Sequence, residues 1–530
     1  MSQTRSELPF EHSHSDETAA KHSDSAQPAG STGNSSSVED SESAPGPNES
    51  TTLSGIWNSP CGPREVLAVG LPLIVSTLSY SVMQFCDRLF LSWYGQLEMA
   101  AVMPAVVLNW TAASLPMGIA SYAATFVAQY EGSKRQKKIG AMIWTACWLG
   151  IYFVPAFALL SFFSDQVFIL FGHEAELIPL ESVYFKIACY GSAAVVFESA
   201  LSSFFIGQGR TTIVMVINLI AMLINLVLDW SFIFGFWIIP EMGIAGAAWA
   251  TTISVWLKVI CYFMLIARRK NMKRFGLSRG IRPNWIQMKR LLKFGGPSGW
   301  QLWMEGMAIS LFVLFIGRIG IVESAATTLA FSVNLIAFIP VVGLGMSVST
   351  LVGQKIGSQE IHLARRAVFY GLMIGLIYSS LFAVLYFAVP HLFLMAHAST
   401  ALGDSFAEIE STAIFLLKFV ATYCIFDCIQ IIYASALKGA GDTQFIFIFT
   451  IINAILFVAL GLAGITLLTA DSPAVVWLMG AEHVDDFELT WWWIVITVWI
   501  LVYALVFFLR FLGGKWTRMS VIDVIRSKSN

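Results

Sequence analysis

Long apolar runs dominate the chain from Arg64 onward. Each run has about 20 or more residues, which is enough for a helix to cross a hydrocarbon core of roughly 30 Å. The pattern predicts an all-α integral membrane protein with twelve transmembrane helices. The predicted spans are 66–92, 99–128, 138–163, 177–206, 212–237, 243–267, 294–316, 324–353, 364–390, 409–437, 444–469 and 490–512.

Composition supports a bilayer as the surrounding solvent. Hydrophobic residues make up 56% of the 530 residues and charged residues 12%, whereas soluble proteins carry about 25% charged residues. The 32 Lys and Arg nearly balance the 34 Asp and Glu, which argues against a nucleic-acid partner. The chain has no phosphate-binding GxxxxGK[ST] loop, no HExxH or GxSxG motif and no zinc-type cysteine spacing. We therefore expect neither an enzyme nor a cofactor.

Lys and Arg occur almost entirely on one side of the predicted spans. Twenty-five of them fall in alternate connections or in the flanks that belong to the same side, and the opposite side has only Arg318. The positive-inside rule then places both termini in the cytoplasm, and we expect the inner membrane of a bacterium.

The two halves of the predicted membrane region resemble each other. At an offset of 225 residues, matching positions include Gly70 with Gly295, Pro72 with Pro297 and Gln129 with Gln354. Each half holds six spans, so the copies share one orientation and are related by an axis along the membrane normal. This predicts two six-helix lobes with substrate bound between them.

The segments outside and between the lobes differ in charge. The predicted organisation is a disordered acidic cytoplasmic tail, a first lobe, a basic cytoplasmic linker, a second lobe and a basic cytoplasmic tail. Their bounds are 1–60, 64–267, 268–293, 294–513 and 514–530.

Five acidic residues lie inside the predicted spans: Asp87, Glu198, Asp229, Glu305 and Asp427. A carboxylate there costs several kcal/mol on insertion scales, so it normally faces a cavity or a partner and is a functional candidate. Of the five, Glu198 aligns with Asp427 in the repeat, which favours a packing role for Glu198. Asp87, Asp229 and Glu305 have no acidic counterpart in the other lobe.

Asn225 and Asp229 are spaced i, i+4 and therefore share one face of a helix. An amide and a carboxyl there could bind one cation together with Asp87. The alternative is that both side chains only cross-link helices through hydrogen bonds.

Several ordered motifs resemble the MATE (multidrug and toxic compound extrusion) family, in particular its bacterial NorM-like branch. They include Pro72 with Asp87, the Asn225 to Asp229 string, Pro297 with Glu305, and Phe426-Asp427 before Gly439. The resemblance implies a V-shaped pair of lobes that exports organic cations, drugs or metabolites in exchange for H⁺ or Na⁺, functional as a monomer.

The resemblance also implies which residues bind the coupling ion. Thr251 would join Asp87, Asn225 and Asp229 in the first lobe, and Glu305 with Asp427 would form a second site. A shared-proton pair that merely locks two helices is the alternative for Glu305 and Asp427. No metal is expected beyond Na⁺ at these sites.

The substrate cavity is expected to contain aromatic and amide side chains, because aromatic faces suit organic cations. Packing is an equal alternative for each candidate. The candidates are Trp110, Trp300, Gln301, Trp303, Gln430 and Tyr433. A flippase for lipid-linked oligosaccharide or peptidoglycan precursors is the nearest rival function, but such proteins need a basic cavity or fourteen spans. A receptor or scaffold would leave the buried acids unexplained.

Overall fold

The computed structural model describes residues 53–170, 173, 175–394, 403–467 and 487–522. Within these ranges the chain is helical, and the only bridge between extended residues joins Phe236 to Ile239. Twelve helices there are long and apolar enough to cross a membrane, which confirms the predicted number. Residues 1–52 and 523–530 of the two predicted tails lie outside the described ranges.

The first lobe contains six spans, one of which is interrupted at Tyr122. Its helices are α2 (Pro63–Tyr94), α3 (Gln96–Ser121), α4 (Ala123–Gly132), α5 (Ile139–Phe162), α6 (Ser164–Leu170), α7 (Ile178–Gly207), α8 (Thr211–Ile233) and α9 (Gly243–Ile266), with the 3₁₀ turn η2 (Gln136–Lys138) before α5. Helix α7 is the most buried span of this lobe and packs against α3, α5 and α9.

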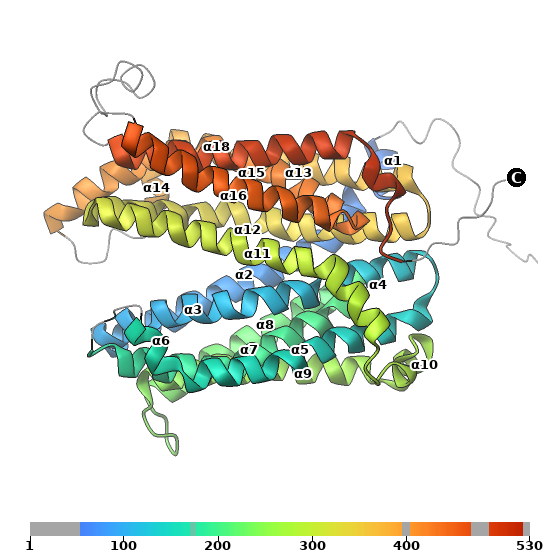
Figure 1. Cartoon of the computed structure of the whole chain (residues 1–530), viewed down its shortest axis with the longest axis horizontal. Coiled ribbons are helices and arrows are strands. Elements are labelled where there is room, and N and C mark those ends of the chain that lie inside the picture. The colour runs from blue at the N-terminus through green and yellow to red at the C-terminus, as the bar shows by residue number, and fades with distance from the viewer. Residues whose placement is uncertain (1–52, 171–172, 174, 395–402, 468–486, 523–530) are drawn as a thin grey trace, which may run out of the picture. The chain divides into compact units, whose positions relative to one another are not determined.

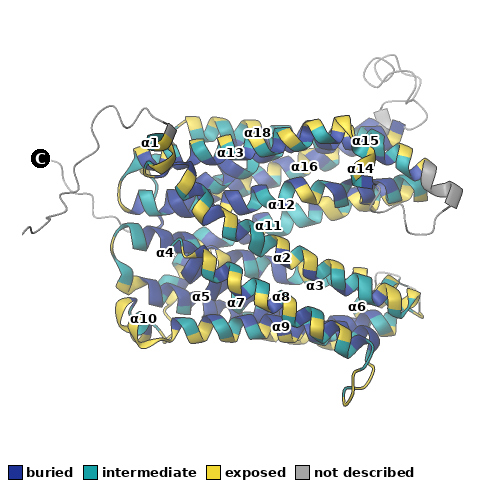
Figure 2. Cartoon of the chain, turned by 180° about the vertical axis from the view of Figure 1, so that it is seen from behind, coloured by how far each residue is buried: buried dark blue, intermediate teal, exposed yellow. Residues whose placement is uncertain are grey.

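The second lobe repeats this plan. Its helices are α11 (Trp285–Ile319), α12 (Ile321–Gly357), α13 (Ile361–Ala388), α14 (Pro390–Leu394), α15 (Gly403–Ala440), α16 (Thr443–Leu467) and α18 (Phe487–Leu512). Figure 1 shows the two lobes as separate helical layers, and they meet where α2 and α4 pack against α12 and where α3 packs against α11. Figure 2 marks exposed residues along the helices of both lobes, and the many large hydrophobic residues among them would contact lipid.

The backbone also repeats between the lobes. Lys134 and Gln359, which are 225 residues apart, are two of the few non-glycine residues with positive φ, at 58° and 65°. Gly209 and Gly441 likewise both have positive φ, at 74° and 104°. Equivalent turns therefore close equivalent helices, as the sequence repeat predicts.

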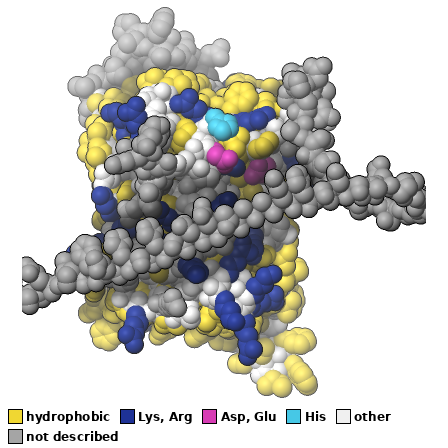
Figure 3. Space-filling view, turned by 90° about the vertical axis from the view of Figure 1, so that its right-hand side faces the viewer, with side chains coloured by type: hydrophobic (Ala, Val, Ile, Leu, Met, Phe, Trp, Pro, Cys, Tyr) yellow, Lys and Arg dark blue, Asp and Glu magenta, His cyan; other side chains and the backbone are white. Residues whose placement is uncertain are grey.

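One end of the molecule, here called the basic end, carries exposed Lys and Arg from both lobes. Figure 3 views this end, where Lys and Arg outnumber Asp and Glu among the visible described side chains. Among the exposed residues here are Lys134 and Lys137 of the first lobe, Arg268 after α9, and Arg365 and Lys515 of the second lobe. The linker that joins the lobes here contains α10 (Arg269–Arg274) and η3 (Leu277–Arg279), and η5 (Lys515–Arg518) follows α18.

The structure differs from the sequence prediction at two helix ends. Helix α1 (Leu53–Asn58) lies inside the segment predicted to be disordered, and Cys61 just after it is fully buried. Helix α11 begins at Trp285, inside the predicted linker, because Asn284 caps it by accepting hydrogen bonds from the backbone of Ile286 and Gln287. An apolar run marks only the part of a helix that lies in the membrane, and the helix itself can continue beyond that run into water.

Candidate functional site

Three helices bring the predicted first-lobe residues together. Asp87 lies on α2, Asn225 and Asp229 on α8, and Thr251 on α9. Helix α8 packs against both α2 and α9, so its i, i+4 face lies between them. The Thr251 hydroxyl donates a hydrogen bond to Oδ2 of Asp87 over 3.1 Å, and the carboxyl of Asp229 interacts directly with that of Asp87.

The polar atoms of this group are buried and largely unpaired. Asp87 is 3% exposed, while Asn225 and Asp229 are fully buried. Among the described residues, no hydrogen-bond partner exists for Oδ1 of Asp87, for either carboxyl oxygen of Asp229, or for the amide oxygen and nitrogen of Asn225. Buried polar atoms are normally paired, so this cluster indicates a proton shared between the two carboxyls, a bound ion or water. Carboxylate, amide and hydroxyl oxygens are the ligands that hard cations prefer.

Two neighbours of this group had not been predicted. Tyr184 on α7 is buried and interacts electrostatically with Asp87 and Asp229, and the charge of Arg88 acts on Asp87. The Nε of Arg88 is itself buried, with no hydrogen-bond partner in the described ranges. Sequence spacing left the relation of Arg88 to Asp87 open, because adjacent residues point about 100° apart on a helix.

The second-lobe acids form a looser group. Glu305 on α11 accepts a hydrogen bond of 2.7 Å from Nε2 of Gln301, and Asp427 on α15 interacts with Glu305 electrostatically. No hydrogen bond joins the two carboxyls in the described part of the chain. The charge of Lys438 also acts on Glu305. Lys438 was predicted to lie in a connection, but α15 continues to Ala440 and includes it in the last turn.

The family of this chain follows from its sequence match. The sequence model of the MatE family matches residues 72–231 and 301–463, which together make up more than half of the chain. The chain belongs to this family. It is therefore a MATE transporter and a multi-pass membrane protein.

Relatives support the same assignment. The chain is 27% identical over 392 residues to the "Multidrug resistance protein NorM" of Photobacterium profundum, covering 73% of this chain and 84% of that protein. Its fold matches the crystal structure of the eukaryotic MATE transporter AtDTX14 with a TM-score of 0.70 and 20% identity, over 86% of this chain and 96% of that one. It also matches an outward-facing multidrug resistance MATE family transporter with a TM-score of 0.74 and 17% identity, over 86% and 97%.

The predicted cavity residues of this MATE transporter fall in different surroundings. Trp110 on α3 and Trp300 on α11 are 40% and 44% exposed, and Trp303 contacts Trp300 edge to face. Gln301 is buried and bound to Glu305, and Gln430 is half-buried. Tyr433 is buried against Phe508 and Phe511 of α18. The two exposed tryptophans lie on helices that pack against each other across the lobes.

Two lysines inside the spans of the first lobe have acidic partners in the same lobe. Lys258 lies 3.9 Å from Glu198, which agrees with a packing role for that acid. Lys186 forms an ion pair of 3.1 Å with Asp165 of α6 instead of reaching for the interface alone. The nearby Ser182 hydroxyl and the Lys186 ammonium hold the pKa of Asp165 below its usual range. These pairs distinguish structural charges from the unpaired atoms around Asp229.

Proposed function

We propose that this MATE transporter exports small organic, mostly cationic compounds across the bacterial inner membrane in exchange for H⁺ or Na⁺. The observation that carries the proposal is the buried group of Asp87, Asn225 and Asp229, in which every side-chain oxygen except Oδ2 of Asp87 lacks a hydrogen-bond donor among the described residues. The printed name of the NorM relative agrees with multidrug export. Both termini would lie in the cytoplasm with the basic end, no cofactor would be needed, and one chain in the bilayer would suffice.

Binding of the cation would change the preferred arrangement of the lobes. Two carboxylates in a dry interior are costly without a positive charge, so the empty site favours a state in which water reaches it. A proton or a sodium ion removes that cost and favours the closed site. Asp87 and Asp229 would hold the ion, Asn225 and Thr251 would complete its oxygen shell, and Glu305 with Asp427 would provide a second site.

The membrane potential sets how many ions are needed. One inward charge yields about 2.3 kcal/mol per 100 mV, hence about 3.5 kcal/mol at roughly 150 mV, which supports a gradient of a few hundredfold for a neutral substrate. Exchange of one cation for a monovalent drug is electrically silent. A site in each lobe would restore the contribution of the voltage.

The flippase alternative is not favoured. A diphosphate-linked lipid needs a basic cavity, whereas the candidate sites here are acidic and aromatic. The functional test is efflux from proteoliposomes with sodium and pH gradients imposed separately. Uphill export driven by at least one gradient is expected, and export indifferent to both would refute the proposal.

Thr251→Val is expected to weaken the apparent affinity for the coupling ion about tenfold with the maximal rate preserved. The change removes the one hydroxyl that donates to Asp87, and a hydrogen bond to a charged group contributes about 1.5–3 kcal/mol. The measurement is the cation concentration or pH that gives half-maximal export. Thr252→Val is the matched control, because Thr252 bonds weakly to the carbonyl of Ile187 instead. Equal effects of the two variants would contradict the assignment.

A further inference from the structure

The lobes cross closely at the basic end, where α4 packs against α12. Any Cβ atom at Gly132 would overlap the backbone of Gln354, and one at Gly357 would overlap the backbone of Gln129. Gly132 and Gly357 are related by the internal repeat. The same close approach is therefore made twice, once by each lobe on the other.

A glutamine beside each glycine bonds across the lobes. The Nε2 of Gln129 donates to the carbonyl of Gly439 over 3.0 Å, and the Nε2 of Gln354 donates to the carbonyl of Gly207 over 2.9 Å. Gln129 matches Gln354 in the repeat, and Gly207 matches Gly439. Gln129 of the first lobe therefore bonds to the end of α15 in the second lobe, and Gln354 of the second lobe bonds to the end of α7 in the first lobe.

The two halves of this arrangement differ at one point. The Oε1 of Gln129 accepts hydrogen bonds from the Ser520 hydroxyl at 2.8 Å and from the Val521 backbone at 2.9 Å. Val521 and Trp516 are each only 1% exposed. The segment 515–522, here called the strap, therefore packs onto the first-lobe glutamine after its chain has left α18.

We propose that Gln129 and Gln354 form a two-fold latch that holds the lobes together at the basic end, and that the strap secures the Gln129 half. This inference rests on the proposed function, in which the lobes separate at that end during export. Opening there breaks both glutamine bonds at once, because the two bonds join the same pair of lobes. The latch residues position the lobes and do not touch the transported ion.

Hydrogen exchange on the full chain in nanodiscs, without substrate or gradient, tests the latch. Gln354→Leu is expected to speed exchange of the Arg210 amide about tenfold, because Arg210 lies close to Gly207, which Gln354 contacts. The same increase is expected at the Asp442 and Val521 amides, which Gln354 does not touch. Gln129→Leu should speed exchange at Arg210 by a similar factor. Gln208→Leu is the matched control, because Gln208 bonds within its own helix to Phe204.

Faster exchange confined to the loop that each glutamine touches would overturn the latch and leave ion-coupled export standing. If the glutamine variants speed hydrogen exchange as expected but export by the wild-type protein depends on neither ion, the proposed function is refuted and the latch is not. For the strap, Val521→Asp places a charge at a buried position and should speed exchange at Asp442, whereas Arg518→Asp at an exposed position should not. Equal exchange in these two variants would overturn the role of the strap.

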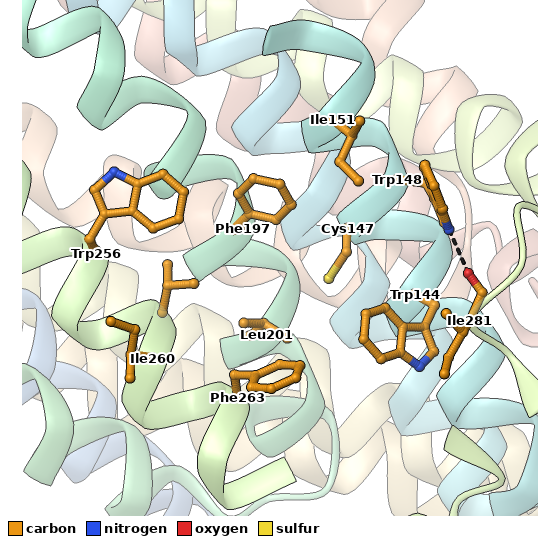
Figure 4. Close-up of a pocket in the computed structure, with 11 residues that line it drawn as sticks. Trp144, Cys147, Trp148, Ile151, Phe197, Leu201, Trp256, Ile260, Phe263 and Ile281 are labelled. Carbon is orange, nitrogen blue, oxygen red and sulfur yellow. Dashed lines mark hydrogen bonds between the residues drawn. The ribbon is translucent and has the colours of Figure 1, made fainter. Parts of the chain in front are cut away.

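A second inference comes from an apolar pocket on the outer face of the first lobe. The pocket has a volume of about 380 Å³ between α5, α7, α9 and the linker, and all its lining residues are apolar (Figure 4). They include Trp144, Trp148, Phe197, Trp256, Phe263 and Ile281. Trp256 and Phe263 are 37% and 48% exposed on the helix face that meets lipid.

The linker closes the pocket at the basic end. The Nε1 of Trp148 donates to the carbonyl of Ile281 over 2.7 Å, and the Nε1 of Trp144 donates to that of Leu277 over 2.9 Å. The indole N–H groups of Trp144 and Trp148 are therefore bound to the linker, and these two residues present apolar ring surface to a ligand.

Basic residues follow directly on the walls of the pocket. Arg282 comes after Ile281, Arg268 lies five residues beyond Phe263, and Lys138 lies six residues before Trp144; all three are exposed. Arg268 comes two residues after the end of α9 and Lys138 directly before the start of α5, so both lie beyond the apolar lining at the basic end. That position suits a phosphate headgroup above an acyl chain.

We infer that the pocket binds an acyl chain of an anionic phospholipid whose headgroup meets Arg268 and Arg282. The complementary charge identifies the occupant, since anionic lipids are attracted to basic residues at the cytoplasmic surface. This inference does not depend on the transport function.

Photocrosslinking in bilayers tests the site with diazirine-labelled phosphatidylglycerol and phosphatidylcholine. Phosphatidylglycerol is expected to label peptides that contain Trp148 and Trp256 at least fivefold more than phosphatidylcholine. The paired change Arg268→Gln and Arg282→Gln should remove this preference, whereas Arg365→Gln on the second lobe should keep it. Equal labelling by both lipids, or no labelling of these peptides, would overturn the inference.

Discussion

Asp229→Asn is expected to lower ion-driven export roughly a hundredfold while the protein stays folded. The asparagine keeps the shape of the side chain and removes the charge that the coupling ion needs, and a charge-assisted contact of about 3 kcal/mol corresponds to that factor. The free energy of unfolding should stay the same or rise, because two buried carboxylates side by side are costly. Asp87→Asn should behave alike.

The measurement is export from proteoliposomes under each imposed ion gradient, with thermal unfolding measured on the same preparations. Glu198→Gln is the matched control, since it also removes a carboxylate charge inside the first lobe but belongs to the pair with Lys258. Export by Asp229→Asn at the wild-type rate and with the wild-type ion dependence would remove the first-lobe site from the account.

Glu305→Gln is expected to abolish the voltage dependence of export for a monovalent cationic substrate. With one coupling ion left, the exchange moves no net charge, so about 3.5 kcal/mol at roughly 150 mV is lost. The attainable accumulation ratio should fall by a few hundredfold, whereas a neutral substrate should still be exported uphill by the first-lobe ion.

Accumulation ratios of a monovalent and a neutral substrate at a clamped potential provide this measurement. Glu323→Gln is the control, because Glu323 lies in the first turn of α12 and away from the second-lobe acids. An undiminished accumulation of the cation would show that Glu305 takes no part in coupling.

The span bounds were largely predictable because a bilayer imposes a length on every apolar run. The i, i+4 spacing placed Asn225 and Asp229 on one face, and the family resemblance named Thr251, whose hydroxyl donates to Asp87 in the structure. Side chains from other helices could not be predicted in this way. Tyr184 gave no signal among the many aromatic residues, and Lys438 was misplaced because α15 extends beyond its apolar stretch.

The latch glutamines did have a sequence signal. Gln129 and Gln354 match at the same offset as Gly132 and Gly357, so both halves carry a glutamine three residues before a glycine. Because glutamine has no charge, the cost of burying charge in a bilayer does not single these residues out. What the sequence could not supply is their partner, because the carbonyls of Gly207 and Gly439 lie in opposite lobes and are distant along the chain.

Countertransport tests the central claim most directly. Proteoliposomes are loaded with substrate at a clamped potential, and uptake of ²²Na⁺ or H⁺ is followed while the substrate leaves down its gradient. Proteoliposomes with the wild-type protein are expected to accumulate one of these cations. Proteoliposomes with the variant in which Asp87, Asp229, Glu305 and Asp427 are all neutralised should accumulate neither. Accumulation by that variant at the wild-type level would contradict ion coupling through the buried carboxyl groups.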